Sequence, residues 1–162
     1  TQYRSGLKWS KYLQQALEID PYYDWTYGLL GDYLGRFAVA APGLSAEKQQ
    51  EILVQASDYY TKAVFLMDPA APQQGYGYLI SYGSTQAQLG NPLKAVQAYL
   101  RALELGPDNP ERWRVEAALA QLYDQLGDLQ TALRFAQQAL TTVPDDQRPA
   151  VEELVQKYGG QP

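Results

Sequence analysis

A phrase of seventeen residues recurs along this chain and limits its fold more than any other feature of the sequence. It reads KAVQAYLRALELGPDNP at 94–110, TALRFAQQALTTVPDDQ at 131–147 and KWSKYLQQALEIDPYYD at 8–24. A fourth copy, QASDYYTKAVFLMDPAA, lies at 55–71. Each copy has the length of one helix followed by a stop that contains proline. Recurrence of such a unit is typical of helical solenoids, in which each unit buries its apolar face against its neighbours.

Small side chains keep fixed places within the phrase. Alanines recur seven residues apart, which puts them on one stripe of the helix, and the pairs are Ala56 and Ala63, Ala95 and Ala102, and Ala132 and Ala139. An aromatic residue lies between them at Tyr60 or Tyr99. Because small side chains let a neighbouring helix approach closely, these stripes predict helix–helix contacts. The first copy has Trp9 in place of the earlier alanine, so we expect its helix to pack differently.

A second kind of segment precedes three of the four copies. It contains a large–small pair, at Leu30-Gly31, Tyr82-Gly83 and Leu119-Ala120. We expect Gly90 to end one helix in the left-handed conformation, and Asn91-Pro92 to cap and begin the next. Gly127-Asp128 repeats this arrangement, and Asn109-Pro110 repeats the start. The unit is therefore a helix, a tight turn, a second helix and a stop.

These residues resemble the tetratricopeptide repeat family. Its pattern is a large–small pair and an aromatic on the first helix, two alanines flanking an aromatic on the second, and a closing proline. The matching residues here are Tyr82, Gly83, Ala95, Tyr99, Ala102 and Pro107, and again Leu119, Ala120, Tyr123, Ala132, Ala139 and Pro144. Gln86, Glu116 and Ala136 depart from it. The resemblance implies an all-α right-handed solenoid with first helices on its concave side and second helices on its convex side.

We expect residues 1–162 to form a single domain of about three such repeats. Its parts are a leading helix at 5–19, repeats at 24–69, 76–109 and 110–146, and a C-terminal capping helix at 148–158.

The first repeat carries extra residues. We expect 36–51 to form a long insertion between its helices, with a turn at Pro42-Gly43 and with Ser45 capping a second helix of about five turns. Apolar residues in it, Phe37, Val39 and Leu44, indicate either packing on the edge of the repeat or an apolar flap that faces a partner.

Composition argues against nucleic-acid binding and catalysis. The chain has 13 Lys and Arg against 18 Asp and Glu, a net charge of -5, and offers no basic stripe for phosphates. It has no histidine and no cysteine, which removes the usual general base, the thiolate nucleophile and any disulfide. No loop has the spaced Asp-x-Asp-x-Asp-Gly pattern of a calcium site. We expect no enzyme activity, no cofactor and no metal.

The resemblance implies that a partner lies in the concave groove. The groove-facing residues predicted to bind it are Trp25, Asp32, Arg36, Ser84, Gln88, Arg114, Gln121, Asp124 and Gln125. Trp25 would supply buried area, and Arg114 would pair with a carboxylate or phosphate in bidentate fashion. The glutamines suit hydrogen bonds to a peptide backbone or a glycan. The alternative is that these polar residues are simply solvated.

Chaperone-binding members of the family clamp the C-terminal carboxylate of a partner with lysine, asparagine and arginine side chains. At four of these five positions the chain has Gly28, Asp32, Ser81 and Ala118, and only Arg114 fits. A carboxylate clamp of this kind is therefore not expected. We predict a scaffold or adaptor for protein–protein interaction, with a protein or peptide partner of unknown identity.

A second resemblance concerns the run YLQQALEIDPYYDWTYGLLGDYLGR at 12–36. It is similar to helical repeat regions that follow the membrane-embedded part of bacterial O-antigen polymerases and ligases. This resemblance implies a soluble extramembrane domain, on the cytoplasmic or the periplasmic side of a bacterial membrane, with a membrane-embedded portion in the same parent chain.

The start of the chain also has an expected consequence. It begins at Thr1, within a few residues of helical periodicity, so we expect a piece of a longer chain or a processed product. The leading helix has the form of a second helix without its first helix. Its apolar face, with Trp9, Leu13 and Leu17, leaves one flank unpaired. We expect this end either to self-associate or to be continued by another helix of the parent protein.

Overall fold

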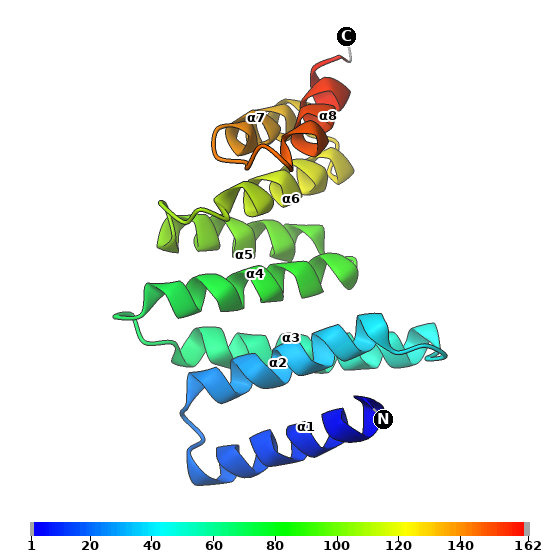
Figure 1. Cartoon of the computed structure of the whole chain (residues 1–162), viewed down its shortest axis with the longest axis vertical. Helices are drawn as coiled ribbons and strands as arrows, with labels where there is room; N and C mark the ends of the chain where they lie inside the picture. Colours follow the sequence, from blue (N-terminus) through cyan, green and yellow to red (C-terminus); the bar gives the residue numbers. More distant parts are fainter. Residues whose placement is uncertain (1, 161–162) are drawn as a thin grey trace.

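The computed structural model describes residues 2–160, and describes the side chains of 11–37 and 40–160. The described residues form eight helices and no strand, stacked along one axis into an elongated solenoid (Figure 1). The helices are α1 (Gln2–Ile19), α2 (Asp24–Ala40), α3 (Ala46–Leu66), α4 (Pro72–Gln88), α5 (Pro92–Leu105), α6 (Arg112–Gln125), α7 (Leu129–Leu140) and α8 (Arg148–Gly159). The prediction of an all-α solenoid of repeats is confirmed.

The helices pack in sequential pairs. The closest associations are α2 with α3, α4 with α5, and α6 with α7. Helix α1 packs on α2 before the first pair, and α8 packs on α7 and touches α6 after the last pair. The second helices of the pairs carry the recurring phrase, and the first helices carry the segments with the large–small pair.

Glycine at the small position of the large–small pair allows α2 and α4 to approach their second helices closely. A Cβ added at Gly83 of α4 would lie 2.8 Å from Cε1 of Tyr99 on α5. A Cβ added at Gly31 of α2 would lie 2.6 Å from the same atom of Tyr60 on α3. The small residue of the first helix and the aromatic of the second helix therefore pack against each other across the pair.

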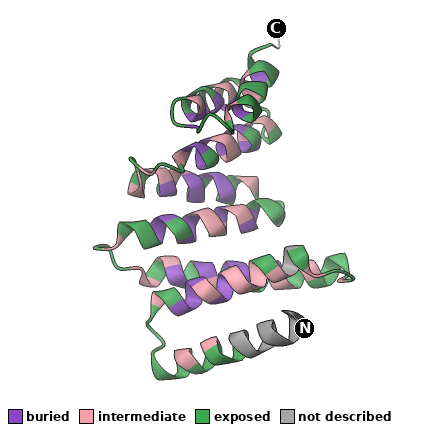
Figure 2. Cartoon of the chain, in the orientation of Figure 1, coloured by how far each residue is buried: buried purple, intermediate pink, exposed green. Residues whose placement is uncertain are grey.

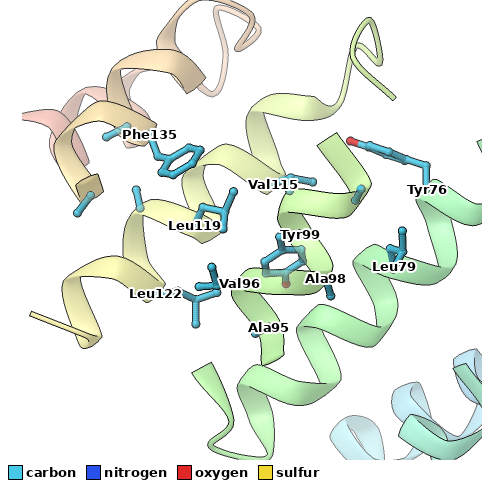
Figure 3. Packing of buried hydrophobic residues seen from close by; sticks show 14 of the residues in the cluster. Tyr76, Leu79, Ala95, Val96, Ala98, Tyr99, Val115, Leu119, Leu122 and Phe135 are labelled. Atoms are coloured by element: carbon cyan, nitrogen blue, oxygen red, sulfur yellow. The ribbon is translucent and has the colours of Figure 1, made fainter. Parts of the chain in front are cut away.

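One continuous core joins the middle of the stack. Its cluster draws Leu79 from α4, Val96 and Tyr99 from α5, Leu119 from α6 and Phe135 from α7 (Figure 3). The alanines of the stripes are buried, and buried residues lie where neighbouring helices meet (Figure 2). Burial of these faces is what makes each repeat depend on the next.

The predicted turns are formed with two changes. Gly90 and Gly127 have φ angles of 75° and 81°, which glycine adopts at little cost. Asp128 caps α7 as predicted, because its carboxylate accepts the Thr131 N–H at 3.0 Å. Asn91 does not cap α5 with its side chain, which donates instead to Gln86 Oε1 at 3.0 Å.

The second change lies before α6. This helix begins at Arg112, so Asn109-Pro110 does not begin it. Asn109 Oδ1 accepts the N–H of Glu111 at 2.9 Å within the preceding turn.

Two of the three departures from the family pattern are buried polar residues with partners. Gln86 Nε2 donates to Ser57 Oγ of α3 at 2.7 Å. Glu116 Oε1 accepts from Arg112 Nη2 one turn earlier on α6, at 2.8 Å. Buried polar groups are tolerated when they are paired, so these substitutions keep the fold. The third, Ala136, is a fully buried small residue of the core cluster.

Residues 36–51 do not form the long insertion that the sequence suggests. Helix α2 continues to Ala40 and α3 begins at Ala46, so most of these residues lengthen the two helices. The turn contains Pro42-Gly43, and Ser45 caps α3 as predicted by accepting the Lys48 N–H at 3.3 Å.

The described apolar residues of this segment lie either on α2 or in the turn before α3. Phe37 is half-buried, and its ring stacks on Tyr33 of the same helix with centroids 6.2 Å apart. Leu44 is half-buried in the turn. The side chains of Val39 and of Trp9 lie outside the described residues. Within residues 2–160, no helix has the length and apolarity needed to cross a bilayer.

Candidate functional site

First helices of successive repeats contact each other at both ends of the stack. In addition to the contacts within pairs, α2 touches α4 and α6 touches α8. All nine predicted site residues lie on α2, α4 and α6. We call this the first-helix side.

On α2 the predicted residues play different parts. Trp25 lies in the first turn, 48% exposed, with its ring tilted against Tyr23 at a centroid distance of 6.1 Å. Arg36 is exposed near the end of the helix. Asp32 faces inward instead and accepts hydrogen bonds from the hydroxyls of Tyr60 on α3, at 2.7 Å, and Ser81 on α4, at 3.3 Å. Asp32 therefore ties three helices together.

The Asp32 contact has an electrostatic consequence. Burial, and then the hydrogen bond to the Asp32 carboxylate, raise the pKa of the Tyr60 hydroxyl well above its usual range. Tyr60 therefore remains a hydrogen-bond donor throughout the physiological pH range.

The aromatic residues around the start of α2 are split between surface and core. Tyr22, Tyr23 and Trp25 are exposed. Tyr27 is buried, and its hydroxyl donates to the Pro21 carbonyl at 3.1 Å. A cluster of exposed rigid rings thus flanks the first repeat.

On α4 the two predicted residues contact each other. Gln88 is exposed, and its Nε2 donates to the carbonyl and the hydroxyl of Ser84, both at 3.4 Å. Neither residue forms a hydrogen bond or ion pair with the predicted residues of α2 or α6 within the described part of the chain. The nine residues therefore do not converge on one point but follow the stack.

On α6, Arg114 is held by its neighbours. Its Nε lies 2.7 Å from Glu111 Oε2, and its guanidinium carbon lies 5.2 Å from the centroid of the Trp113 ring. The pair is exposed on both sides, so it is worth little energy and leaves the guanidinium available.

A pocket of about 540 Å³ opens between α6 and α8. Trp113, Ala117 and Gln121 line it from α6, and α8 contributes Val151, Glu153, Leu154 and Lys157 among others. Of the predicted residues only Gln121 lines this pocket. Gln125 is exposed beyond it at the end of α6.

An ion pair bridges the two helices beside the pocket. Lys157 Nζ on α8 donates to Asp124 Oδ2 on α6 at 2.7 Å. This hydrogen bond is the main cause of the raised pKa of Lys157. Asp124 is thus engaged with α8 and is not a free acceptor on the groove.

Sequence reasoning placed α8 as a cap and missed its contribution to this pocket. One signal was present: the Val-Glu dipeptide at 115–116 recurs at 151–152, and Val115 and Val151 are both buried. The recurrence marks α8 as a further helix of the first type. No group of three or more acidic side chains that could hold a metal ion occurs in the described residues.

Comparison with known proteins agrees with this architecture. Residues 78–144 match the sequence profile of the tetratricopeptide repeat (TPR) family. No curated protein sequence matches the chain at a significant level.

Several solved structures share the fold. A thermophilic TPR protein of Thermus thermophilus has 24% identity and a TM-score of 0.64, over 93% of this chain and 70% of that one. MamA has 16% identity and a TM-score of 0.65, over 93% of this chain and 85% of its own. BtubC from P. vanneervenii has 19% identity and a TM-score of 0.63, over 96% of this chain and 60% of its own. At these identities the likeness establishes the fold alone.

Proposed function

Because residues 78–144 belong to the tetratricopeptide repeat family and the rest of the described chain continues the same fold, we propose that this protein is an interaction scaffold that binds an extended peptide along its first-helix side. Domains of this family are generally scaffolds for protein partners and typically not enzymes. The binding mode and the residues below are our proposal.

The observation that carries the proposal is the pocket between α6 and α8. Its volume of about 540 Å³ is within the range of sites that take small ligands or one or two large side chains. Apolar side chains such as Trp113 and Leu154 line it together with the polar groups of Gln121, Glu153 and Lys157. An apolar side chain of the peptide would fill the pocket, and Gln121 would fix its register.

Charged groups near the pocket would orient the peptide. Arg114 stacks on Trp113, which lines the pocket, and would pair with a carboxylate of the peptide. Its present ion pair with Glu111 is exposed, so replacing Glu111 by a carboxylate of the peptide costs little free energy. Farther along the stack, Trp25 would supply an exposed aromatic anchor.

The proposed alternative, a domain of a membrane polysaccharide polymerase or ligase, is supported by none of the matches described above. It stays a prediction from the run at 12–36, and so do the membrane-embedded portion and the compartment that it implies.

A peptide-selection experiment tests the proposal. The full chain would be immobilised, twelve-residue peptides would be selected from a randomised phage library, and affinities measured by isothermal titration calorimetry. Trp25→Ala and Arg114→Ala should each weaken binding by at least about 1 kcal/mol. Arg134→Ala, on the other side of the stack, should leave it unchanged, because that guanidinium stacks on Phe135 of its own helix.

The opposite pattern of affinities would contradict the proposal. If the selected peptides lose affinity with Arg134→Ala and keep it with Trp25→Ala and Arg114→Ala, the first-helix side is not the binding surface.

A further inference from the structure

A second pocket lies on the opposite side of the stack, where α4 meets the second helices α3 and α5. It has a volume of about 310 Å³. Its apolar walls are Val64 of α3, Leu79 of α4 and Ala98 of α5, of which the last two are labelled in Figure 3. Lys94, Gln97 and Arg101 of α5 also line it.

Two residues that line this pocket have larger counterparts one repeat farther on. In the recurring phrase, Ala98 of α5 corresponds to Phe135 of α7, and Thr61 of α3 corresponds to Leu100 of α5. Phe135 is buried and stacks on Tyr123, with ring centroids 5.5 Å apart. Large side chains thus stand at these two places one repeat farther on, whereas the small Thr61 and Ala98 line the pocket between α3, α4 and α5.

The two cations of this pocket are not used by the fold. Lys94 and Arg101 are exposed and form no ion pair or ring contact within the described residues. The acidic residues nearest along α3 and α5, Asp58 and Glu104, pair with neither of them. One repeat farther on, Arg134 of α7, which corresponds to Gln97, lies 5.1 Å from the centroid of the Phe135 ring. Both cations are therefore available to a negatively charged partner.

We propose that this pocket binds an acidic peptide segment of a partner protein, with one aliphatic side chain in the hollow and a carboxylate on each side of it. The apolar walls at Val64, Leu79 and Ala98 would cover the aliphatic side chain. Lys94 and Arg101 would pair with the carboxylates, and their lack of internal partners means that no ion pair has to be broken first. This site does not depend on the first-helix side.

Helix geometry sets the spacing of the acidic residues. Lys94 and Arg101 are seven residues apart on α5, so their backbones are separated by about 10 Å along the helix axis. In an extended peptide every second side chain faces the same way, and residues four apart are about 13 Å apart. A Glu-x-Leu-x-Glu segment therefore presents its leucine and both carboxylates to the same surface, within reach of the two long side chains.

The probe is the peptide acetyl-Glu-Ser-Leu-Ser-Glu-amide, titrated into the full isotope-labelled chain and followed by methyl NMR. We expect saturable shifts at the methyl groups of Val64, Leu79 and Ala98, with a Kd below about 1 mM. The same peptide with both Glu replaced by Gln should bind at least about tenfold more weakly.

Matched variants locate the site. Lys94→Glu together with Arg101→Glu should weaken the probe at least about tenfold, since attraction becomes repulsion. Arg134→Glu, on the same face one repeat farther on, should leave its affinity unchanged. Ala98→Leu should also weaken binding while both cations remain, because it partly fills the hollow. Circular dichroism of each variant checks that the fold is intact.

Three outcomes would overturn the proposal: no saturable shift at the three pocket methyls, equal binding of the Gln peptide, or equal weakening by Arg134→Glu. Methyl shifts confined to Val151 and Leu154 would place the probe in the pocket between α6 and α8. That result would reject this second site and leave the first-helix proposal standing.

Discussion

The two ends of the solenoid are closed in different ways. At the C-terminal end, α8 packs on α7 with Val151 at 2% exposed and Tyr158 at 4%. At the N-terminal end, α1 packs on α2, and Tyr12 and Ile19 are 62% and 87% exposed. The recurring phrase aligns Tyr12 with the buried Ala98 of α5. The exposed flank of α1 is therefore the face that a first helix covers in a complete repeat.

First and second helices differ in how many faces they need to bury. Helix α8, a helix of the first type, buries only the face that contacts the preceding repeat. Its other side carries exposed polar residues such as Glu152 and Gln156. A second helix must pack both on its own first helix and on the next repeat, so α1 ends with an apolar flank uncovered. The predicted self-association or continuation at this flank stays a prediction.

Removing a large side chain at the closed end should have the largest effect on stability. Tyr158→Ala should lower the free energy of unfolding by about 3 kcal/mol, because it leaves a cavity where α8 meets the core. The Tyr158 hydroxyl is buried with no hydrogen-bond partner among the described residues, so Tyr158→Phe serves as the control and should be nearly neutral. Urea denaturation measures both. Similar values for the two variants would mean that α8 is not part of the core.

Overpacking the middle of the stack should cost somewhat less. Ala102 is fully buried on α5, and Ala102→Leu should lower stability by roughly 1–3 kcal/mol because the added carbons force the helices apart. Urea denaturation that shows this variant equal to the parent protein would contradict the repeat register proposed for the phrase.

Alkaline pH should lower the stability of the fold, because buried tyrosines occur on α3, α4 and α8. Burial raises the pKa values of Tyr60 on α3, Tyr78 on α4 and Tyr158 on α8 above the usual range of tyrosine. Above pH about 10 these tyrosines ionise in the unfolded chain and stay protonated in the folded one. The folded state then binds more protons than the unfolded state, so the stability of the fold decreases as the pH rises through this range.

Tyrosinate absorbance and helical circular dichroism, recorded together between pH 9 and 12, check this linkage. Part of the absorbance increase should coincide with the loss of helix. An increase that is complete while the helical signal is unchanged would show that the buried hydroxyls ionise freely.

The smallest effect is expected at the open end. Tyr12→Ala makes the same change as Tyr158→Ala, but at an exposed position of α1, and should alter stability by no more than about 0.5 kcal/mol. A loss comparable with that of Tyr158→Ala, measured by urea denaturation at low protein concentration, would mean that the flank of α1 is covered after all.

The architecture could be predicted because its rules are local. Alanines such as Ala95 and Ala102, and the pairing of Gly83 with Tyr99, fix how closely helices pack, and they recur at constant spacing. The sequence was less informative where the extra residues could be helix or loop: 36–51 has no strong helical periodicity, yet most of it extends α2 and α3. The start of α6 also differed, at Arg112 instead of Asn109-Pro110, and the Asn91 side chain bonded to Gln86 instead of capping α5.

The site could be predicted only as a surface. Sequence placed its residues on first helices correctly, but could not show that Asp32 turns inward to Tyr60 or that Asp124 pairs with Lys157. Both facts depend on contacts between helices far apart in sequence. The two pockets also escaped prediction, because a hollow is set by the side chains that fail to fill it. Ala98 becomes informative only beside its counterpart Phe135.

Native-state hydrogen exchange tests most directly the claim that the solenoid is closed at α8 and open at α1. Amides in the middle of α8, at 151–155, should exchange only through openings close to global unfolding, because Val151 and Tyr158 anchor the helix in buried clusters. Amides at 13–17 of α1 should exchange at least about a hundredfold faster, since that helix packs on α2 and leaves Tyr12 and Ile19 exposed. Equal protection of the two helices at low protein concentration would contradict the account.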